Sequence, residues 1–180
     1  MATNKTCLGA LVNNLTVSCG VPQHGIAQMV IADYVDITSW AVDANNANVN
    51  NISFNAGAVM SLVETYKLSA QATEALRTLD AGAALAQTVS FTIYSKNLYG
   101  ATVSALANRR ILIVAQYKET GLYKVFGLRC GLEMVSADSD SNADGGYFKL
   151  SFSTPEGALG ESSYTISKSV YDAFLAKINV

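Results

Sequence analysis

Residues 136–146, SADSDSNADGG, hold the side chains best suited to bind a metal ion. Oxygen-bearing side chains recur there at every second position: Asp138, Asp140, Asn142 and Asp144. The first four ligands of a twelve-residue helix–loop–helix calcium site are spaced in the same way. The stretch is therefore a candidate calcium loop, provided that the rest of that motif is present.

Three further requirements of the calcium loop are not met. The sixth position needs a glycine and holds Ala143, and the twelfth needs a bidentate acid and holds Lys149. The flanking segments read as strands rather than helices. Because Asp, Asn, Ser and Gly are also the common turn formers, the sequence favours the turn of a β-hairpin over a metal site.

The cysteines and the histidine form no recognisable centre. Cys7, Cys19 and Cys130 make no CxxC pair, and the chain has one histidine, His24. A zinc site needs more ligands at workable spacing. Cys19 and His24 are near each other in sequence, which alone does not indicate a nucleophile pair. The odd number of cysteines argues against a secreted disulfide scaffold, and we predict no metal and no cofactor.

Motifs of common enzymes are also missing, including GxSxG, the P-loop, GxGxxG after a strand and HExxH. Asp33 and Asp36 lie at a strand break without a partner histidine, and Arg109-Arg110 borders an apolar run, as a solvated strand end does. We therefore predict no catalytic residue and no enzymatic activity. Six tyrosines could form a stacking platform but are more typical of half-buried strand or interface positions: Tyr66, Tyr94, Tyr99, Tyr117, Tyr123 and Tyr147.

The composition favours a protein that assembles. The 180 residues are 50% hydrophobic but only 14% charged, against roughly 25% in an average soluble protein. A surface so poor in charge resists association weakly, although an ordinary neutral monomer fits the composition equally well. The net charge of −2 gives no bulk attraction to nucleic acid. We find neither a signal peptide nor a membrane span, and expect a chain kept in the cytoplasm until assembly.

The first half of the chain reads mainly as strands. Alternation predicts strands over 26–34 and 36–44, a turn over 45–51 and a short strand at 52–57. Residues 58–79 fit either a helix or a strand. Because 87–95, QTVSFTIYS, is a clear strand, a long hairpin of 58–79 with 87–95 is favoured.

The second half adds two helices. Asn97 is a plausible N-cap for a helix over 97–108. Hairpins are expected from 110–117 with 122–128 and from 130–136 with 147–153, followed by a helix over 169–178. The predicted fold is mainly β, a β-sandwich or small barrel with one helix inserted between strands and a short C-terminal helix.

This order of elements resembles phage tail-tube proteins, related to the tubes of contractile injection systems and type VI secretion. More narrowly, it is similar to small tail proteins of phages and prophages of the Bacteroidetes. Thr154-Pro155-Glu156 stands where such proteins end a strand in TxPE. The likeness covers residues 5–162 and leaves 163–180 as a predicted contact arm of a single domain over 1–180. It is carried by the opening Cys7 and Cys19, QTVSFTIYS, RRILIVAQYKETGLYKVFGL and DSNADGGYFKLSFSTPEGALGE.

The resemblance implies a virion structural protein. Its subunits would form stacked, hexameric rings around a DNA conduit, made in the host bacterium and joined to other tail or neck proteins. DNA would pass without sequence-specific binding, and no membrane would be involved. The alternatives are a neck, adaptor, terminator or other capsid-associated protein, and a calcium- or carbohydrate-binding β-sandwich. The 58–95 hairpin is the predicted subunit interface, through Met60, Leu62, Glu64, Tyr66, Leu68, Phe91 and Ile93.

Overall fold

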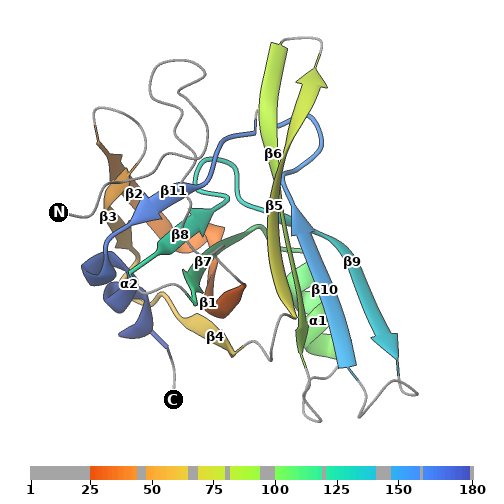
Figure 1. The fold of residues 1–180 in the computed structure, drawn as a ribbon. Coiled ribbons are helices and arrows are strands. Elements are labelled where there is room, and N and C mark those ends of the chain that lie inside the picture. Colours follow the sequence, from red (N-terminus) through yellow and green to blue (C-terminus); the bar gives the residue numbers. More distant parts are fainter. Residues whose placement is uncertain are drawn as a thin grey trace, which may run out of the picture.

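The computed structural model describes residues 25–43, 48–64, 69–79, 82–93, 100–118, 121–140, 147–158 and 160–178. They form a mainly β protein with two antiparallel-rich sheets (Figure 1). The strands are β1 Ile26–Asp33, β2 Ile37–Val42, β3 Asn48–Phe54, β4 Met60–Glu64, β5 Ala70–Leu79, β6 Gly82–Ile93, β7 Ile111–Tyr117, β8 Tyr123–Phe126, β9 Glu133–Asp140, β10 Tyr147–Ser153 and β11 Tyr164–Ile166. The helices are the 3-10 turn η1 Tyr34–Asp36, α1 Gly100–Ala107 and α2 Lys168–Leu175.

The larger sheet has seven strands in the order β2-β3-β11-β8-β7-β1-β4. Its central strands β1 and β7 pair antiparallel from Ile26 to Asp33, and both carry unbroken apolar runs, MVIA and ILIVA. Nearly every side chain in these runs is buried, because cores lie against both faces of the sheet. Continuous apolar sequence is the pattern expected of strands covered on both sides.

Helix α2 covers one face of the larger sheet. Ser167 caps the helix, accepting from the Val170 N–H, and Val170, Tyr171 and Phe174 point into the core. The Phe174 ring meets Phe54 edge to face, with centroids 4.8 Å apart. The apolar side of a short amphipathic helix thus closes this half of the molecule.

The smaller sheet covers the opposite face, in the order β5-β6-β10-β9. Val89 and Phe91 of β6 and Leu150 and Phe152 of β10 alternate inward and are buried against β1 and β7. Phe91 and Phe152 stack with ring centroids 5.8 Å apart. Val103 and Leu106 bring α1 against the same core.

The predicted fold class is confirmed in its main features. The chain is mainly β, with two sheets, one short helix inserted between strands and one at the C-terminal end. The described strands do not close into a barrel, so the sandwich-like arrangement of the two sheets is the one adopted. The hairpins of β7 with β8 and β9 with β10 also form as expected.

The long hairpin predicted for 58–79 with 87–95 is wrong in one respect. The segment forms two strands in different sheets: β5 pairs with β6, whereas β4 pairs with β1. The physical reason lies in β4, where Met60 and Val63 face opposite sides and are buried in the two different cores. A strand that serves both cores belongs at the edge of the middle layer, not beside β6.

Three smaller differences concern element limits. Part of the turn predicted over 45–51 is strand, because β3 begins at Asn48, and the strand predicted to end at residue 136 continues to Asp140. The short strand β11 was not predicted; it pairs parallel with β3 and antiparallel with β8. Together with α2, it builds the predicted contact-arm segment into the larger sheet and its core.

Phe174→Ala should lower the free energy of unfolding by about 3–5 kcal/mol, because it opens a cavity in a fully buried site where two layers meet. Asp172→Ala, on the exposed side of the same helix, removes an i,i+4 pair with Lys168 and should cost less than about 0.5 kcal/mol. Urea unfolding of both variants measures the difference. Equal losses would show that α2 does not close the core.

Candidate functional site, an assembly interface at the sheet edges

Among the described strands, four lie at the edges of the two sheets: β2 and β4 in the larger sheet and β5 and β9 in the smaller one. An edge strand presents unpaired N–H and C=O groups and is a template for pairing with another chain. Natural proteins protect such edges with charge, proline or bulges. The degree of protection at each edge therefore indicates where a partner strand could add.

The exposed large apolar side chains of the described structure gather at these edges. Leu76 of β5 is 71% exposed and Val135 of β9 is 61% exposed. Trp40 lies on β2 and Leu62 on β4, while Val35 and Val59 stand directly before these two strands. Apolar side chains held at open edges are characteristic of surfaces that become covered in an assembly.

The four edges differ in regularity. The pairing of β2 with β3 shifts twice, and that of β9 with β10 shifts where Val135 is the extra residue. Bulges of this kind bend a strand and interrupt its regular pairing. By contrast, β4 pairs regularly over five residues, and β5 pairs with β6 over ten residues without a shift. The outer side of β5 is thus the longest regular edge in the described chain.

The end of this hairpin extends beyond its own sheet (Figure 1). Strand β10 pairs with β6 only from Thr88 to Ile93, so residues 75–79 and 82–86, the hairpin tip, have no other strand partner among the described residues. Ala75, Leu76 and Thr78 are exposed, and Ala84, Leu85 and Ala86 are half-buried. The tip is a short, weakly charged ribbon with an open outer edge.

The predicted interface residues do not form one surface. Met60 and Phe91 are 2% and 1% exposed, since each points into a core. Leu62 and Glu64 are exposed, but on β4 in the other sheet. Ile93 is half-buried at the far end of β6 from the tip, and Tyr66 and Leu68 lie outside the described residues.

The exposed residues of the hairpin lie nearer its tip and were not among the predicted interface residues. Ala75, Leu76 and Thr78 are the exposed part of β5, within a segment that read equally as a helix. The one available signal was the absence of proline together with the sparse charge between 70 and 86. The lack of proline and charge indicates an open sheet edge only when the segment is already known to be a strand.

A buried polar network lies at the base of the tip. Gln87 of β6 is 1% exposed; its Nε2 donates to the Glu161 carbonyl at 2.8 Å, and its Oε1 accepts from the Gly127 N–H at 2.7 Å. The Glu161 carboxylate accepts from the Arg129 N–H at 2.7 Å. These bonds join β6, the turn after β8 and the segment that follows β10.

The charge of Glu161 is incompletely compensated. Its second oxygen, Oε2, lies 3.3 Å from Arg129 Nε as an ion pair but has no well-directed hydrogen bond. Burial raises the pKa of this carboxyl, and the hydrogen bond from the Arg129 N–H opposes the rise without cancelling it. The arrangement is that of a structural carboxylate, held between elements, rather than of a group facing a cleft.

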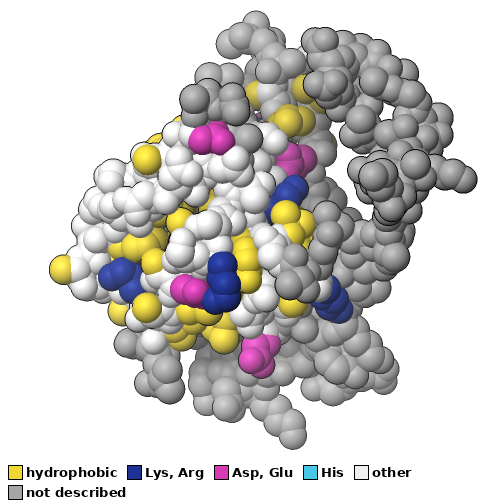
Figure 2. Space-filling model, turned by 60° about the vertical axis from the view of Figure 1, so that its left-hand side comes forward, with side chains coloured by type: hydrophobic (Ala, Val, Ile, Leu, Met, Phe, Trp, Pro, Cys, Tyr) yellow, Lys and Arg dark blue, Asp and Glu magenta, His cyan; other side chains and the backbone are white. Residues whose placement is uncertain are grey.

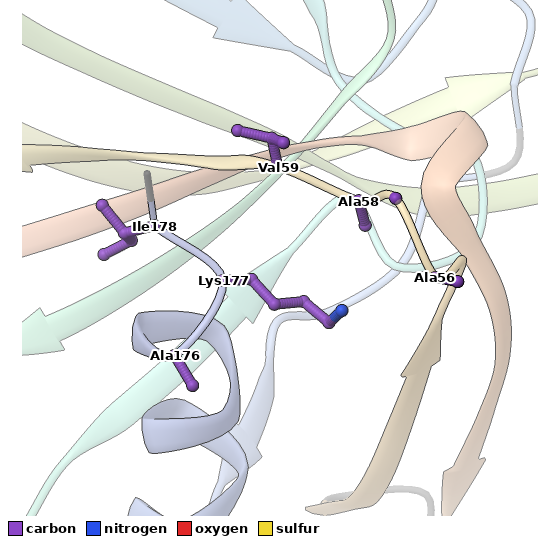
Figure 3. Close-up of a pocket in the computed structure, with 7 residues that line it drawn as sticks. Ala56, Ala58, Val59, Ala176, Lys177 and Ile178 are labelled. Atoms are coloured by element: carbon purple, nitrogen blue, oxygen red, sulfur yellow. The ribbon is translucent and has the colours of Figure 1, made fainter. Parts of the chain in front are cut away.

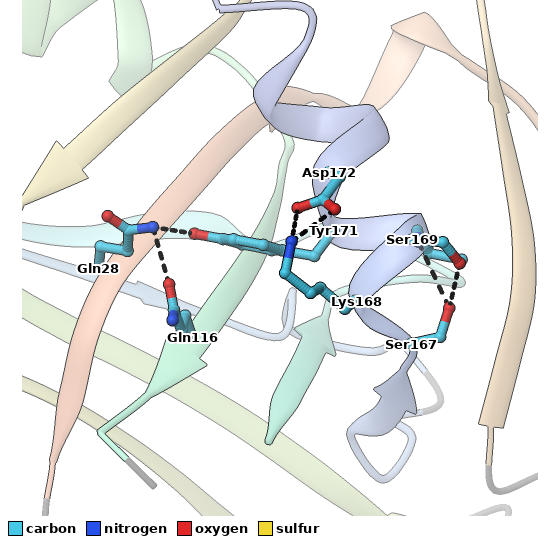
Figure 4. A network of polar contacts seen from close by, with 8 residues as sticks. Gln28, Gln116, Ser167, Lys168, Ser169, Tyr171 and Asp172 are labelled. Atoms are coloured by element: carbon cyan, nitrogen blue, oxygen red, sulfur yellow. Dashed lines mark hydrogen bonds and ion pairs between the residues drawn. The ribbon is translucent and has the colours of Figure 1, made fainter. Parts of the chain in front are cut away.

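Helix α2 is fastened by a second polar network (Figure 4). Gln28 and Gln116 stand opposite each other on β1 and β7, and Gln28 Nε2 donates at 2.8 Å both to Gln116 Oε1 and to the Tyr171 hydroxyl. Burial raises the pKa of Tyr171. Because the tyrosine hydroxyl is already engaged and its ring packs on Tyr123, this network holds the helix in place.

The depression shown in Figure 3 lies between the β3–β4 turn and the end of α2, with a volume of about 350 Å³. Small side chains and backbone line it, and Lys177 is its charged group. The Lys177 ammonium lies 5.8 Å from the centroid of the Phe54 ring. One cation among alanines provides no set of converging groups for a ligand or a reaction.

Other candidates from the sequence have structural partners. Asp33 caps η1 and pairs with Arg109 at 2.5 Å, and Arg110 pairs with Glu133 at 2.9 Å. Asp138 lies within β9 opposite Lys149. Among the described residues, no group of three acids, cysteines or histidines could hold a metal ion; Asn142, Asp144, Cys7, Cys19 and His24 lie outside them.

The described surface is poor in charge. Figure 2 shows a face on which uncharged side chains predominate and acidic and basic groups are few and scattered. None of the described helices is both long and apolar enough to cross a membrane. The sheet edges are therefore the feature of the described surface best suited to bind another protein chain.

Glu161→Gln tests the buried carboxylate by its pH dependence. Because the pKa of Glu161 is raised in the folded state, its contribution to stability is greatest below the ordinary carboxyl pKa and falls as pH rises toward the folded value. The wild type should therefore lose stability relative to Glu161→Gln as the pH rises above the ordinary carboxyl pKa of about 4. Urea unfolding at a series of pH values measures it, with Glu156→Gln, an exposed position nearby, expected to follow the wild type. A difference that does not change with pH would contradict the assignment.

Comparisons of the chain with protein-family models, with curated proteins and with solved structures found no match. The resemblance to tail-tube proteins rests on short segments and on the order of the elements, and stays a prediction. The function of this chain therefore has to be argued from its own geometry, in which the open sheet edges are the principal feature.

Proposed function

We propose that this chain is a structural subunit of a phage tail tube, which assembles with copies of itself into stacked rings that form a conduit for DNA. The observation that carries the proposal is the β5–β6 hairpin. Its outer strand offers ten regularly paired residues with an open side, and its tip extends past the sheet. A long, regular edge of this kind is a template for pairing with another chain.

The order of the smaller sheet suits a ring. Its two edges, β5 and β9, lie at opposite ends of the sheet, so the β5 edge of one copy can meet the β9 edge of the next. Such a head-to-tail contact uses two different surfaces and closes into a ring when the rotation between copies permits. The bulge at Val135 adds the curvature that a closed sheet requires.

The charges at these edges fit the same contact. Strand β9 carries three acids, Glu133, Asp138 and Asp140, whereas β5 carries one acid and one base, Glu74 and Arg77. Three acids on β9 disfavour the pairing of β9 with itself relative to its pairing with β5. Few other charges have to be desolvated, because the chain is only 14% charged.

The tail-tube role follows from combining this geometry with the resemblance. A tube through which DNA is ejected benefits from a surface that does not attract phosphate, and the net charge of −2 is compatible with that. The resemblance implies six subunits in each ring, a place in the virion tail and contact with other tail or neck proteins. A neck or terminator protein remains the alternative, distinguished by rings that do not stack.

Wild-type protein should form rings or tubes with a central hole as its concentration rises, measured by mass photometry and negative-stain microscopy. Leu76→Lys places a charge on the open edge and should raise the concentration at half-assembly about tenfold or more, which corresponds to 1.4 kcal/mol per tenfold. Ala56→Lys, an exposed apolar position in the turn between β3 and β4, is the control and should assemble like the wild type.

Two outcomes would overturn the proposal. One is a wild-type protein that stays monomeric at all concentrations. The other is assembly of Leu76→Lys at the wild-type concentration, which would exclude β5 as the interface. Thermal unfolding tests whether both variants are folded. Their melting temperatures should match that of the wild type, because an exposed side chain contributes little to the stability of the monomer.

A further inference from the structure

Neither of the two described cores includes a residue of the hairpin tip. Within the described part of the chain, residues 75–79 and 82–86 pair with each other and extend past β10. An isolated two-stranded ribbon is marginally stable in water. Something else therefore has to hold the tip in one orientation, and the contacts around it identify the segment after β10.

Residues 154–158 and 160–163, the strap, run from the end of β10 across the base and side of the tip. Thr154 continues the ladder: its N–H donates to the Gln87 carbonyl, and its hydroxyl accepts from the Gln87 N–H, both at 2.9 Å. Arg77 of β5 donates to the Pro155 carbonyl at 3.4 Å. The strap therefore contacts both strands of the hairpin.

The far end of the strap is bound by Glu74 of β5. The Glu74 carboxylate accepts from the Ser162 hydroxyl at 3.0 Å and from the Ser163 N–H at 3.3 Å, and also from the Ser163 hydroxyl. A carboxylate with three donors from two adjacent residues fixes the position of the strap on the hairpin. Below this point, Glu161 joins the strap to Gln87 and Arg129.

The strap comes very near the backbone of the hairpin at Gly160. A Cβ on this residue would lie 1.8 Å from the Leu85 carbonyl oxygen and 2.6 Å from the Leu85 carbonyl carbon. Both atoms are backbone, so neither can move aside as a flexible side chain could. The backbone conformation of Gly160 is open to other residues, so the requirement for glycine is one of space.

The strap lies along the β6 side of the hairpin tip. The Gln87 carbonyl points away from β5, toward Thr154, and the Leu85 carbonyl two residues away points to the same side. The strap thus covers the edge of β6 that β10 leaves unpaired. No strand of the described part of the chain pairs with the β5 edge of the tip.

We propose that the strap is a positioning device for self-assembly: it shields the β6 edge of the tip and holds the β5 edge in the orientation that a second copy of this chain pairs with. This inference rests on the proposed function. Gly160 is its positioning residue, because only glycine lets the strap reach the Leu85 backbone. Glu74 is the clasp at its outer end.

The test compares Gly160→Ala with Gly57→Ala. Gly57 also has a backbone conformation open to other residues, but nothing lies within 4 Å of an added Cβ there, so the second variant is the matched control. Native-state hydrogen exchange of monomeric protein reports on residues 75–79 and 82–86, with β7 as the internal reference. Mass photometry reports on assembly.

Gly160→Ala should speed exchange in the tip about tenfold or more while leaving β7 unchanged, and should raise the concentration at half-assembly by a similar factor. Gly57→Ala should match the wild type in both. If Gly160→Ala affects the whole fold, Glu74→Ala provides a second test, with the same selective effect on the tip. Glu74→Gln, which retains an acceptor oxygen, should recover part of the protection.

The possible failures are distinguishable. Tip exchange that is unchanged in Gly160→Ala and Glu74→Ala would overturn the strap whether or not the protein assembles. A looser tip with unchanged assembly would show that the strap does not position the interface. A wild type that never assembles would overturn the proposed function, and with it the positioning role, even if the tip responds as expected.

Discussion

Burial of β1 and β7 on both faces is the constraint on which the rest of the structure depends. Two neighbouring strands with unbroken apolar runs need a cover on each side. Helix α2 provides one cover and the smaller sheet provides the other. Because β4 contributes to both cores, it closes the middle layer on one side. The polar and weakly charged residues are left for the outer strands, which become the open edges.

The same layering explains why the hairpin is the interface that we propose. The inner half of β5 and β6 is fixed by Val89 and Phe91 in the core, whereas the tip reaches past β10. Ala75, Leu76 and Thr78 are exposed, so these three side chains add little to the core of the monomer. The length of the hairpin is explained if the tip is completed by another subunit, as an edge in a continuous sheet would be.

Much of the fold could be predicted from the sequence, and the part that could not has a physical reason. The burial of β7 and β10 can be predicted from the apolar run ILIVAQY and from the alternation in YFKLSFS, and α2 can be predicted from the spacing of its apolar residues. The structure of residues 58–79 cannot be predicted in this way. Strand β4 faces two cores and the tip of β5 faces neither of them, so neither segment has a simple hydrophobic period. Gln87, Glu161 and Gly160 were missed for another reason: their roles depend on contacts between residues more than 30 positions apart.

The central claim is that the outer edge of β5 is where subunits join. Hydrogen exchange on wild-type protein, compared between dilute monomer and assembled protein, tests it most directly. The account predicts that amides of β5 and β9 gain protection on assembly, while those of β1 and β7, which are already buried, do not change. Assembled protein in which the β5 amides exchange as fast as in the monomer would contradict it.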